Sequence, residues 1–383
     1  MSGFRAYLRA RIEAEGPQPI ERVMAEALGH PEHGYYITRD PFGAGGDFIT
    51  APDISQMFGE LVGLWCARTH EQMGAPARLR LVELGPGRGS LMADALRATA
   101  RLATFRDAIE LHLVETSPAL RDVQRRTLGD AAVHWHDRLD SIPDGPAIII
   151  ANEFFDALPV RQFLATRQGW RERLVALAEG PDAFRFTESA EAPPELPSWP
   201  PDARALPAGA IAEDSPARAA LAAAIGRRLS DHGGAALVID YGHAASAPGD
   251  TLQAVKAHRK VPVLDTLGEA DLTAHVDFAA LARAATAAGA RAWGPVRQGD
   301  FLLALGIETR AARLLARAST AQAAAIETAL HRLTALDQMG ALFKALALTQ
   351  PDAAMPEGFT NRGTEGGAQA IRPSVNCPLS SDA

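Results

Sequence analysis

Apolar positions in the N-terminal part of the chain recur at helical spacing. They do so over 4–28, where the Gly16-Pro17 pair interrupts the pattern and divides it into two predicted short helices. The same spacing returns over 53–73 and predicts a third helix. The intervening stretch 34–52 is rich in glycine and aromatic residues, and a non-helical stretch of that length is typical of a functional loop.

From residue 79 onward, short apolar runs alternate with helical segments. One helix is predicted to begin at Ser90 and another spans 117–128, opened by a Ser-Pro pair that is typical of a helix start. This alternation predicts a parallel, doubly wound sheet. Its first four strands are predicted at 79–84, 110–116, 132–137 and 146–152.

The second half of the chain interrupts this order. A fifth strand is predicted at 235–242, with a polar stretch after it. Two hairpins are predicted, one at 160–177 and one in which 290–296 and 301–307 flank a glycine turn. The remaining segments are a loop at 186–207, helices at 215–232, 276–289 and 308–348, and a tail from Pro351 that is predicted to be disordered.

Composition narrows the protein class. The chain has 383 residues, of which 47% are hydrophobic and 22% charged, values typical of a globular protein. No apolar run reaches the ~18 residues that membrane insertion requires, and a net charge of −8 disfavours a dedicated nucleic-acid binder. Neither a disulfide framework nor a cysteine-based zinc site is predicted from Cys66 and Cys377. The N-terminus lacks the pattern of a signal or transit peptide, which predicts a cytoplasmic protein.

The strongest chemical motif follows the first sheet strand. Glu83 ends that strand, and three alternating glycines precede the next helix (Gly85, Gly87 and Gly89, with Pro86 between the first two). Glycines permit close approach of a ligand to the backbone, and a helix start offers unpaired N–H groups. The spacing differs from that of dinucleotide-binding loops. An acidic residue ahead of the glycines suits the cationic methionyl end of S-adenosylmethionine, although a tight strand-to-helix turn alone would also explain the pattern.

Two further acids follow the next strands. Glu115 stands where nucleoside-binding sheets place a carboxylate on the ribose hydroxyls, so we predict ribose binding over a role as a helix cap. Asp137 follows the third strand and is a candidate for a place beside the adenine, or for a solvated surface acid.

The fourth strand ends in a block that combines carboxylates with aromatic side chains. Asn152, Glu153 and Asp156 fall at the predicted ligand-binding edge. The two carboxylates are candidates for holding a guanidinium or amine nucleophile, because Arg–carboxylate pairing is bidentate and directional. Phe154 and Phe155 are predicted to be core residues. No metal site is predicted, because the His134–His136 pair has no third ligand nearby in sequence.

Several long blocks of the chain resemble the MidA/NDUFAF7 family, which comprises class I, S-adenosylmethionine-dependent methyltransferases of bacteria and mitochondria. The resemblance runs from about residue 4 to about residue 348, in order. The blocks that carry it are GYYITRDPFGAGGDFITAPDISQMFGE (34–60), LVELGPGRGSLM (81–92), LHLVETSPALRDVQ (111–124), ANEFFDALPVRQF (151–163), VIDYG (238–242) and GEADLTAHVDF (268–278).

The resemblance implies roles for particular residues. Mitochondrial members are protein-arginine N-methyltransferases that act on a subunit of respiratory complex I and assist its assembly. The glycine motif and Glu115 map on the family's cofactor-binding residues, and the family's loop at 46–52 implies contacts to the cofactor from Asp47 and Thr50. His275, in the last block, is a weaker catalytic candidate.

The resemblance also implies a seven-stranded, Rossmann-like class I methyltransferase fold. We expect N-terminal helices and a cofactor-covering loop over 1–75 and a methyltransferase core over 76–307. The remaining expected parts are an insertion at about 160–232, a C-terminal helical segment at 308–350 and a tail at 351–383.

The predicted reaction is direct transfer of the sulfonium methyl to an arginine nitrogen of a protein, such as a complex I subunit or its bacterial equivalent. Glu153 or Asp156 would take the proton. No metal, DNA or membrane insertion is predicted, and the expected location is the bacterial cytoplasm, or the mitochondrial matrix for a eukaryotic member. Alternatives are a methyltransferase of a small molecule or RNA and a non-catalytic, cofactor-binding assembly factor. The glycine spacing disfavours a nicotinamide oxidoreductase.

Overall fold

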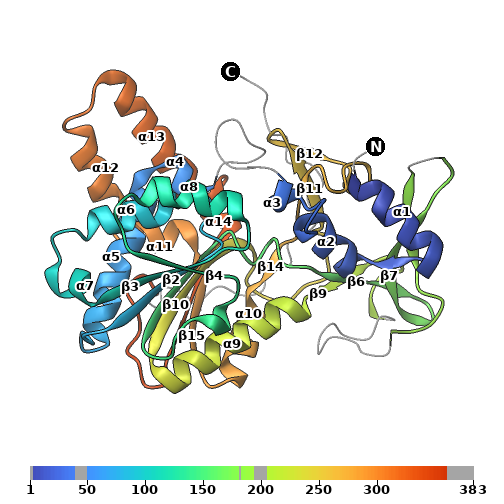
Figure 1. The fold of residues 1–383 in the computed structure, drawn as a ribbon, viewed down its shortest axis with the longest axis horizontal. Helices are drawn as coiled ribbons and strands as arrows, with labels where there is room; N and C mark the ends of the chain where they lie inside the picture. The colour runs from blue at the N-terminus through green and yellow to red at the C-terminus, as the bar shows by residue number, and fades with distance from the viewer. Residues whose placement is uncertain (1–2, 39–49, 181–182, 194–204, 360–383) are drawn as a thin grey trace.

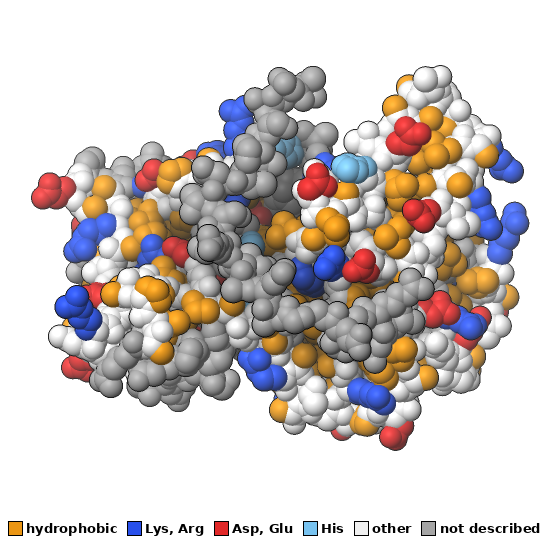
Figure 2. Space-filling model, turned by 180° about the vertical axis from the view of Figure 1, so that it is seen from behind, with side chains coloured by type: hydrophobic (Ala, Val, Ile, Leu, Met, Phe, Trp, Pro, Cys, Tyr) orange, Lys and Arg blue, Asp and Glu red, His pale blue; other side chains and the backbone are white. Residues whose placement is uncertain are grey.

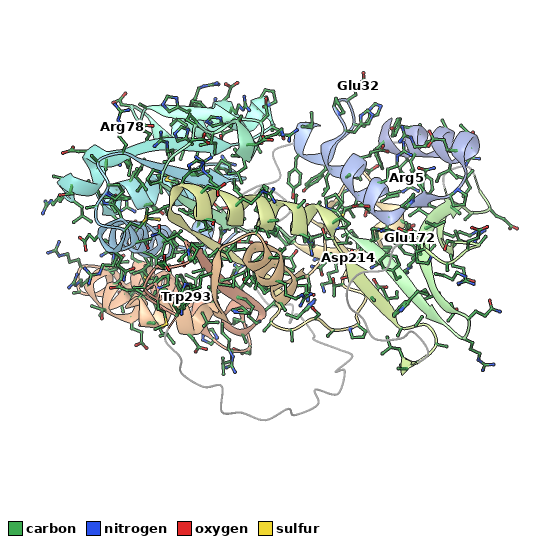
Figure 3. All side chains as sticks on the ribbon, turned by 90° about the horizontal axis from the view of Figure 1, so that it is seen from below. Arg5, Glu32, Arg78, Glu172, Asp214 and Trp293 are labelled. Atoms are coloured by element: carbon green, nitrogen blue, oxygen red, sulfur yellow. The ribbon has the colours of Figure 1, made fainter. Side chains whose placement is uncertain are left out.

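The computed structural model describes residues 3–38, 50–180, 183–193 and 205–359. These residues form two lobes (Figure 1), a larger one built on the central sheet and a smaller one that contains the N-terminal helices. Figure 3 shows the same division from below. Of its labelled residues, Arg78 and Trp293 lie in the larger lobe, and Arg5, Glu32 and Glu172 lie in the smaller one.

The central sheet is mainly parallel, as the sequence predicts. Its neighbouring strands run β15-β16-β10-β5-β2-β3-β4, and a short strand, β14 (Val276–Asp277), pairs with the end of β10. All pairs from β10 to β4 are parallel, whereas β16 is antiparallel to both of its neighbours. This confirms the predicted seven-stranded sheet. The strands are β2 (Leu79–Leu84), β3 (Ile109–Val114), β4 (Val133–His136), β5 (Ala147–Asn152), β10 (Gly234–His243), β15 (Arg291–Arg297) and β16 (Phe343–Thr349).

Both faces of the sheet are covered by helices, which explains the continuous apolar runs of its central strands. In β5, Ile148 and Ile150 pack toward α5 (Gln56–Gln72) and α6 (Ser90–Ala98), while Ile149 packs toward the opposite face. That opposite face is covered by α9 (Pro216–His232) and α10 (Phe278–Ala287). The remaining helices of this lobe are α4 (Ala51–Ile54), α7 (Ala103–Ala108), α8 (Pro118–Leu128), α11 (Gln298–Ala304), α12 (Ile307–Leu315), α13 (Thr320–Thr334) and α14 (Met339–Leu342), with a 3-10 turn at Leu139–Ser141.

The smaller lobe combines three segments that are distant in sequence. The N-terminal helices pack with the inserted strands and with strands from 253–273 around one apolar cluster, which includes Phe4, Met24, Val175 and Leu272. Its elements are α1 (Gly3–Glu15), β1 (Gln18–Pro19), α2 (Ile20–Gly29), α3 (Tyr35–Thr38), β6 (Arg161–Thr166), β7 (Gly169–Leu177), β8 (Phe184–Glu188), β9 (Ile211–Asp214), β11 (Gln253–Lys256), β12 (Arg259–Val261), a 3-10 turn at Val263–Asp265 and β13 (Asp271–Thr273).

Two predictions for the C-terminal part are wrong. The predicted hairpin of 290–296 with 301–307 does not form, because β15 pairs with β16 and residues 298–304 form helix α11. The helical segment expected over 308–350 ends at Leu342 and is followed by β16. In both places a short apolar run is compatible with either a strand or a helix, and its tertiary partners determine which one forms.

Predictions for the inserted and intervening segments are partly confirmed. The hairpin expected at 160–177 forms as β6 and β7. The loop expected at 186–207 begins with the end of β8, and the polar stretch at 243–276 contains β11, β12 and β13. These strands are only three to five residues long, too short for a clear alternating pattern. The prediction of a disordered tail from Pro351 is wrong for residues 351–359, which pack on the larger lobe: Phe359 is buried in its core, and Trp65 Nε1 donates a hydrogen bond to the carbonyl of Glu357 (3.1 Å). The rest of the predicted tail, from 360 on, lies outside the described residues.

Positive and negative side chains are interspersed on the face shown in Figure 2. In the part of the chain that the structure describes, every helix is too short or too polar to cross a lipid bilayer.

Helix α5 packs tightly on α6, the helix that follows the glycine motif. A Cβ atom added at Gly63 would lie 2.5 Å from the Cα atom of Ala95, and one added at Gly59 would lie 2.7 Å from the Cβ of Asp94. Glycine at these two positions on one face of α5 therefore permits the close approach that fixes α6 on the sheet.

We expect the substitution Gly63→Ala to destabilise the protein by about 1–3 kcal/mol, because the added methyl group meets backbone rather than a movable side chain. Urea unfolding measures this cost. Gly29→Ala is the matched control, because Gly29 lies in α2 with open space around its Cα, and alanine there should be neutral or stabilising by up to about 1 kcal/mol. Equal stability of the two variants would contradict the packing account.

Candidate active site

The chemically active residues follow the parallel strands at one edge of the sheet. Register pairs Leu84 with both Val114 and Ala151, and pairs Val114 with His136, so these strands end side by side. The residues that come next therefore meet at one place, as expected for the carboxyl ends of a parallel sheet. They are Gly85, Glu115, Asp137 and Glu153.

The turn after β5 is held by the carboxylate of Asp240 on the neighbouring strand β10. One oxygen, Oδ2, accepts hydrogen bonds from the backbone N–H groups of Phe154 (3.2 Å), Phe155 (3.0 Å) and Asp156 (3.1 Å). Glu153 adopts the left-handed conformation, with φ of 48°. Such strain costs about 1–3 kcal/mol, which three hydrogen bonds of about 1 kcal/mol each can offset. Asp240 thus fixes the direction in which Glu153 and Asp156 leave the sheet.

The glycine loop is shaped by two neighbouring side chains. A Cβ atom at Gly85 would lie 2.5 Å from the ring of Phe154, so only glycine leaves room for that ring. Gln124 on α8 donates a hydrogen bond to the carbonyl of Gly87 (2.8 Å) and another to Glu115 Oε2 (3.2 Å). The loop and the predicted ribose-binding acid are therefore held together by one amide.

Glu83 is buried at the start of the glycine loop. Its side chain is 3% exposed, and Oε2 has no hydrogen-bond partner among the described residues. Burial raises the pKa of Glu83 to about 8. An acidic side chain with a buried, unpaired oxygen favours a cationic ligand, which would supply both the missing hydrogen bond and the missing charge. The observation fits the ammonium group expected at this position.

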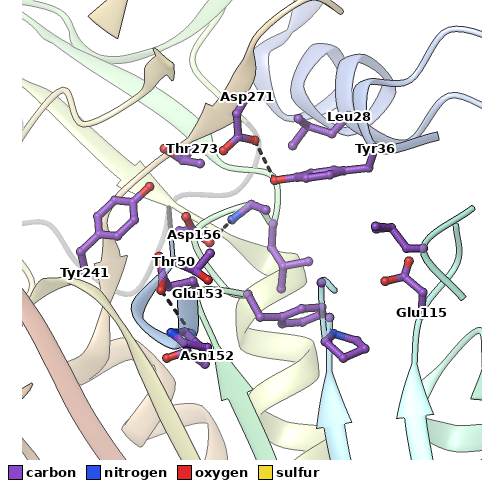
Figure 4. A pocket seen from close by; sticks show the side chains of 18 of the residues that line it. Leu28, Tyr36, Thr50, Glu115, Asn152, Glu153, Asp156, Tyr241, Asp271 and Thr273 are labelled. Carbon is purple, nitrogen blue, oxygen red and sulfur yellow. Dashed lines mark hydrogen bonds between the residues drawn. The ribbon is translucent and has the colours of Figure 1, made fainter. Parts of the chain in front are cut away.

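A cavity of about 900 Å³ extends from the glycine loop to the smaller lobe. Figure 4 shows its two walls. Glu115, Asn152, Glu153 and Asp156 come from the sheet edge, whereas Tyr36 and Asp271 come from the smaller lobe. The cavity therefore lies between the lobes, with the glycine loop at one end.

The acidic groups in this cavity are perturbed mainly by burial. Burial raises the pKa of Glu153 to about 8, although its Oε1 accepts hydrogen bonds from Ala51 N (2.7 Å) and Asn152 Nδ2 (3.2 Å). Burial also raises the pKa of Asp156. His275 lines the same cavity, and burial lowers its pKa to about 4, which keeps the imidazole neutral at physiological pH.

The structure brings most of the predicted site residues together. The cavity is lined by Glu83, Gly85, Pro86, Gly87, Glu115, Asp137, Asn152, Glu153, Asp156, His275 and Thr50. Asp137 also pairs with Arg121 and is largely exposed, and the Thr50 hydroxyl donates to Asp53. Gly89 does not line the cavity; it is the N-cap of α6 and has a left-handed backbone. Asp47 lies outside the described residues.

Phe154 and Phe155 were both predicted to be core residues, and this is confirmed in full only for Phe155. Phe155 is fully buried in the cluster beneath α9 and α10, whereas Phe154 lines the cavity.

Sequence reasoning missed several residues that shape the site. Asp240 and Tyr241 stand in the VIDYG block, and Asp271 and Thr273 stand in the GEADLTAHVDF block. These blocks of the family resemblance could have drawn attention to them. Tyr36 stands in the first of the resembling blocks. The roles of Tyr36, Asp271 and Thr273 depend on how the smaller lobe folds against the sheet, and the role of Asp240 depends on the pairing of β10 with β5. The local pattern reveals neither.

The arrangement can hold a nucleoside with a cationic tail at the glycine loop and a second cation among the carboxylates beyond it. Oxyanions and metal ions are less suited. Among the described residues no group of three or more His, Cys, Asp or Glu side chains has a metal-binding arrangement.

Comparison with known proteins agrees with this arrangement. Residues 61–296 match the model of the Methyltransf_28 family, described as S-adenosyl-L-methionine-dependent methyltransferases. A crystal structure of a COG1565 superfamily member from Burkholderia thailandensis, bound to S-adenosyl-homocysteine, is similar to this chain with a TM-score of 0.80 and 30% identity. The alignment covers 94% of this chain and 95% of that one.

Curated relatives are similar over most of their length. The protein arginine methyltransferase NDUFAF7 homolog, mitochondrial, of Drosophila melanogaster is 37% identical over 372 residues, covering 89% of this chain and 83% of the relative. Protein arginine methyltransferase NDUFAF7, mitochondrial, of Danio rerio is 38% identical, with 81% and 78% covered. The Homo sapiens protein of that name is 36% identical, with 81% and 74% covered.

The buried charge at Glu83 makes a prediction about stability. The unfolded side chain loses its proton near pH 4.5 and the folded one near pH 8, so the folded state is destabilised progressively between these values. Glu83→Gln removes this loss. We expect the stability of the variant relative to wild type to rise by about 3 kcal/mol between pH 5.5 and 8, measured by urea unfolding.

Glu327→Gln is the control for that experiment, because Glu327 is exposed on α13. Its stability should stay within about 0.5 kcal/mol of wild type, as for most surface substitutions. A pH-independent difference for Glu83→Gln would show that Glu83 is not a buried acid with a raised pKa.

Proposed function

We propose that this chain, which belongs to the family of S-adenosyl-L-methionine-dependent methyltransferases, methylates a guanidinium nitrogen of arginine in a protein substrate. The observation that carries the proposal is the cavity in which the buried carboxylates of Glu153 and Asp156 lie beyond the glycine loop. The similarity to relatives named protein arginine methyltransferases supports the same acceptor.

The glycine loop and its neighbours fit the cofactor. Glu83 would take the ammonium group, because its buried Oε2 has no partner among the described residues. Glu115 would take the ribose hydroxyls, since each carboxylate oxygen that already accepts one hydrogen bond can accept another. Asp137 and Asn152 line the same cavity and are further candidate contacts. When bound, S-adenosylmethionine supplies an electrophilic methyl group.

The carboxylates beyond the loop would bind and orient the acceptor. A guanidinium pairs with carboxylates through bidentate hydrogen bonds, which fix both its position and its plane. Asp156 is held rigidly, because its backbone N–H is bonded to Asp240 and its carbonyl accepts from Arg218. Alignment of nucleophile and methyl group is the main contribution that such a site can make.

Glu153 is the proposed proton acceptor. A pKa of about 8 makes it a suitable base near neutral pH, and it lies at the cavity end of β5. His275 is a second candidate that lines the cavity, but its lowered pKa makes it a weaker base than Glu153.

The acceptor protein is proposed to be a subunit of respiratory complex I or its bacterial equivalent, in line with the family resemblance. The cytoplasmic location stays a prediction of the sequence alone.

The direct test is transfer of methyl groups to arginine-containing proteins and peptides, located by mass spectrometry. Wild type is expected to methylate arginine, and Gly85→Ala to lose at least tenfold in affinity for S-adenosyl-homocysteine because its methyl group meets the Phe154 ring. Gly129→Ala is the matched control. Its φ of 58° is close to the 60° of Gly85, but it has open space around it.

Cofactor binding without any methylated product would favour the non-catalytic alternative, and methylation of RNA or a small molecule alone would refute an arginine acceptor.

The proton-acceptor role predicts a pH profile. Only ionised Glu153 can accept a proton, so kcat/KM for the acceptor should rise about tenfold per unit from pH 6 and level off at or below pH 8. The reason for a plateau below 8 is that a bound sulfonium lowers the pKa of a nearby acid. Steady-state rates at saturating cofactor measure the profile. Glu153→Gln should be nearly inactive, and unchanged activity of that variant would refute the role.

A further inference from the structure

The carboxylate of Glu115 is held by two hydrogen bonds, one on each oxygen. Oε1 accepts the backbone N–H of Ser117 (2.8 Å), and Oε2 accepts Nε2 of Gln124 (3.2 Å). Glu115 is 8% exposed and lines the cavity, and Figure 4 shows it just after a sheet strand. Each oxygen keeps a further lone pair for a ligand. The two bonds therefore fix the directions in which this carboxylate accepts hydrogen bonds.

The amide of Gln124, which is fully buried on α8, has one possible orientation. Its Oε1 accepts the indole N–H of Trp135 (2.8 Å), and its Nε2 donates to the carbonyl of Gly87 (2.8 Å) as well as to Glu115. An indole N–H only donates, whereas a carbonyl and an ionised carboxylate only accept. Turning the amide by 180° would place donor against donor and acceptor against acceptor at all three contacts.

Trp135 determines this orientation from outside the cavity. It lies on β4, the edge strand of the sheet, in register with Leu113 on β3, and the guanidinium of Arg125 covers its ring at 4.7 Å from the centroid. Its side chain does not line the cavity. The indole N–H therefore acts on a ligand only through Gln124, by directing the N–H groups of the amide toward Glu115 and the glycine loop.

The same amide favours the ionised form of Glu115. Burial raises the pKa of Glu115, and the hydrogen bonds from Ser117 and Gln124 act against that rise. Its charged neighbour is Arg121, which donates to the backbone carbonyl of Glu115 (2.8 Å from Nε) and to the carboxylate of Asp137 (2.6 Å). An ionised carboxylate accepts hydrogen bonds through both oxygens, as a pair of neighbouring hydroxyl groups requires.

We propose that Gln124, oriented by Trp135, is the positioning residue that makes the nucleoside site prefer a ribose to a deoxyribose. The inference rests on the proposed function, in which Glu115 takes the ribose hydroxyls. Two neighbouring hydroxyls need two acceptor oxygens with fixed directions. A site that hydrogen-bonds a hydroxyl group rejects the analogue that lacks it, because a buried acceptor then stays unpaired. A carboxylate that can rotate away from Gln124 loses part of this discrimination.

The test compares the binding of S-adenosyl-homocysteine with that of its 2′-deoxyribose analogue, by isothermal titration calorimetry without turnover. Wild type should bind the ribose form at least tenfold more tightly. Gln124→Met nearly keeps the size of the side chain but removes the amide, and should reduce the ratio to threefold or less. The ratio is the decisive quantity, because damage to the fold or to the glycine loop would weaken both ligands alike.

Two further variants and a kinetic measurement separate positioning from a structural role. Trp135→Phe keeps an aromatic ring but removes the indole N–H, so the amide can turn and the ratio should be intermediate. Arg126→Met changes an exposed residue of the same helix and should keep the ratio of wild type. In steady-state assays, Gln124→Met should raise KM for S-adenosylmethionine at least tenfold and leave kcat at saturating cofactor within about threefold.

The outcomes distinguish this inference from the proposed function. If Gln124→Met keeps a tenfold ratio, or if wild type binds both sugars equally, the positioning role is wrong, whereas methylation of arginine by wild type would still support the proposed function. If the ribose preference depends on Gln124 but no arginine is methylated, the proposed function fails and the positioning role stands. If Gln124→Met lacks a cooperative thermal transition, Trp135→Phe decides, and a ratio equal to that of wild type in this variant would overturn the inference.

Discussion

The site depends on one carboxylate that is not itself a ligand-binding group. Asp240, fully buried on β10, accepts the N–H groups of three successive residues after β5 and so determines how the chain leaves the sheet. The turn places the Phe154 ring over Gly85 and directs Glu153 and Asp156 into the cavity. Without this anchor, the turn would lose the three hydrogen bonds that offset the strain of the left-handed backbone at Glu153. The cofactor loop and the acceptor side of the cavity are therefore built from one local interaction between neighbouring parallel strands.

The second constraint is the burial of acidic groups with few compensating cations. Burial raises the pKa of both Glu83 and Glu153 to about 8, and a buried oxygen of Glu83 lacks a partner among the described residues. Such an arrangement costs folding stability and is typical of functional sites. It favours cationic ligands in two places, at the start of the glycine loop and beside Glu153. A methyl donor with an ammonium group and a guanidinium acceptor meet these two requirements.

The sequence predicted those elements and site residues that a local pattern determines, and missed those that depend on tertiary contacts. The glycine motif between β2 and α6 and the acids that follow the strands were predictable, because apolar runs and the parallel-sheet rule place them at one edge. β16 was missed, because its alanines and leucines also suit a helix and only pairing with β10 and β15 makes it a strand. The strands at 253–273 were missed because they are short and polar. Asp271 was missed as well, because its place in the cavity depends on how the smaller lobe packs against the sheet.

The most direct measurement is a crystal structure of the protein with S-adenosyl-homocysteine and an arginine peptide. The account predicts the nucleoside along the glycine loop with its ribose hydroxyls on Glu115 and its ammonium on Glu83. The guanidinium should lie beside Glu153 and Asp156 and face the sulfur. A nucleoside bound elsewhere, or an arginine side chain outside the space between the lobes, would contradict it.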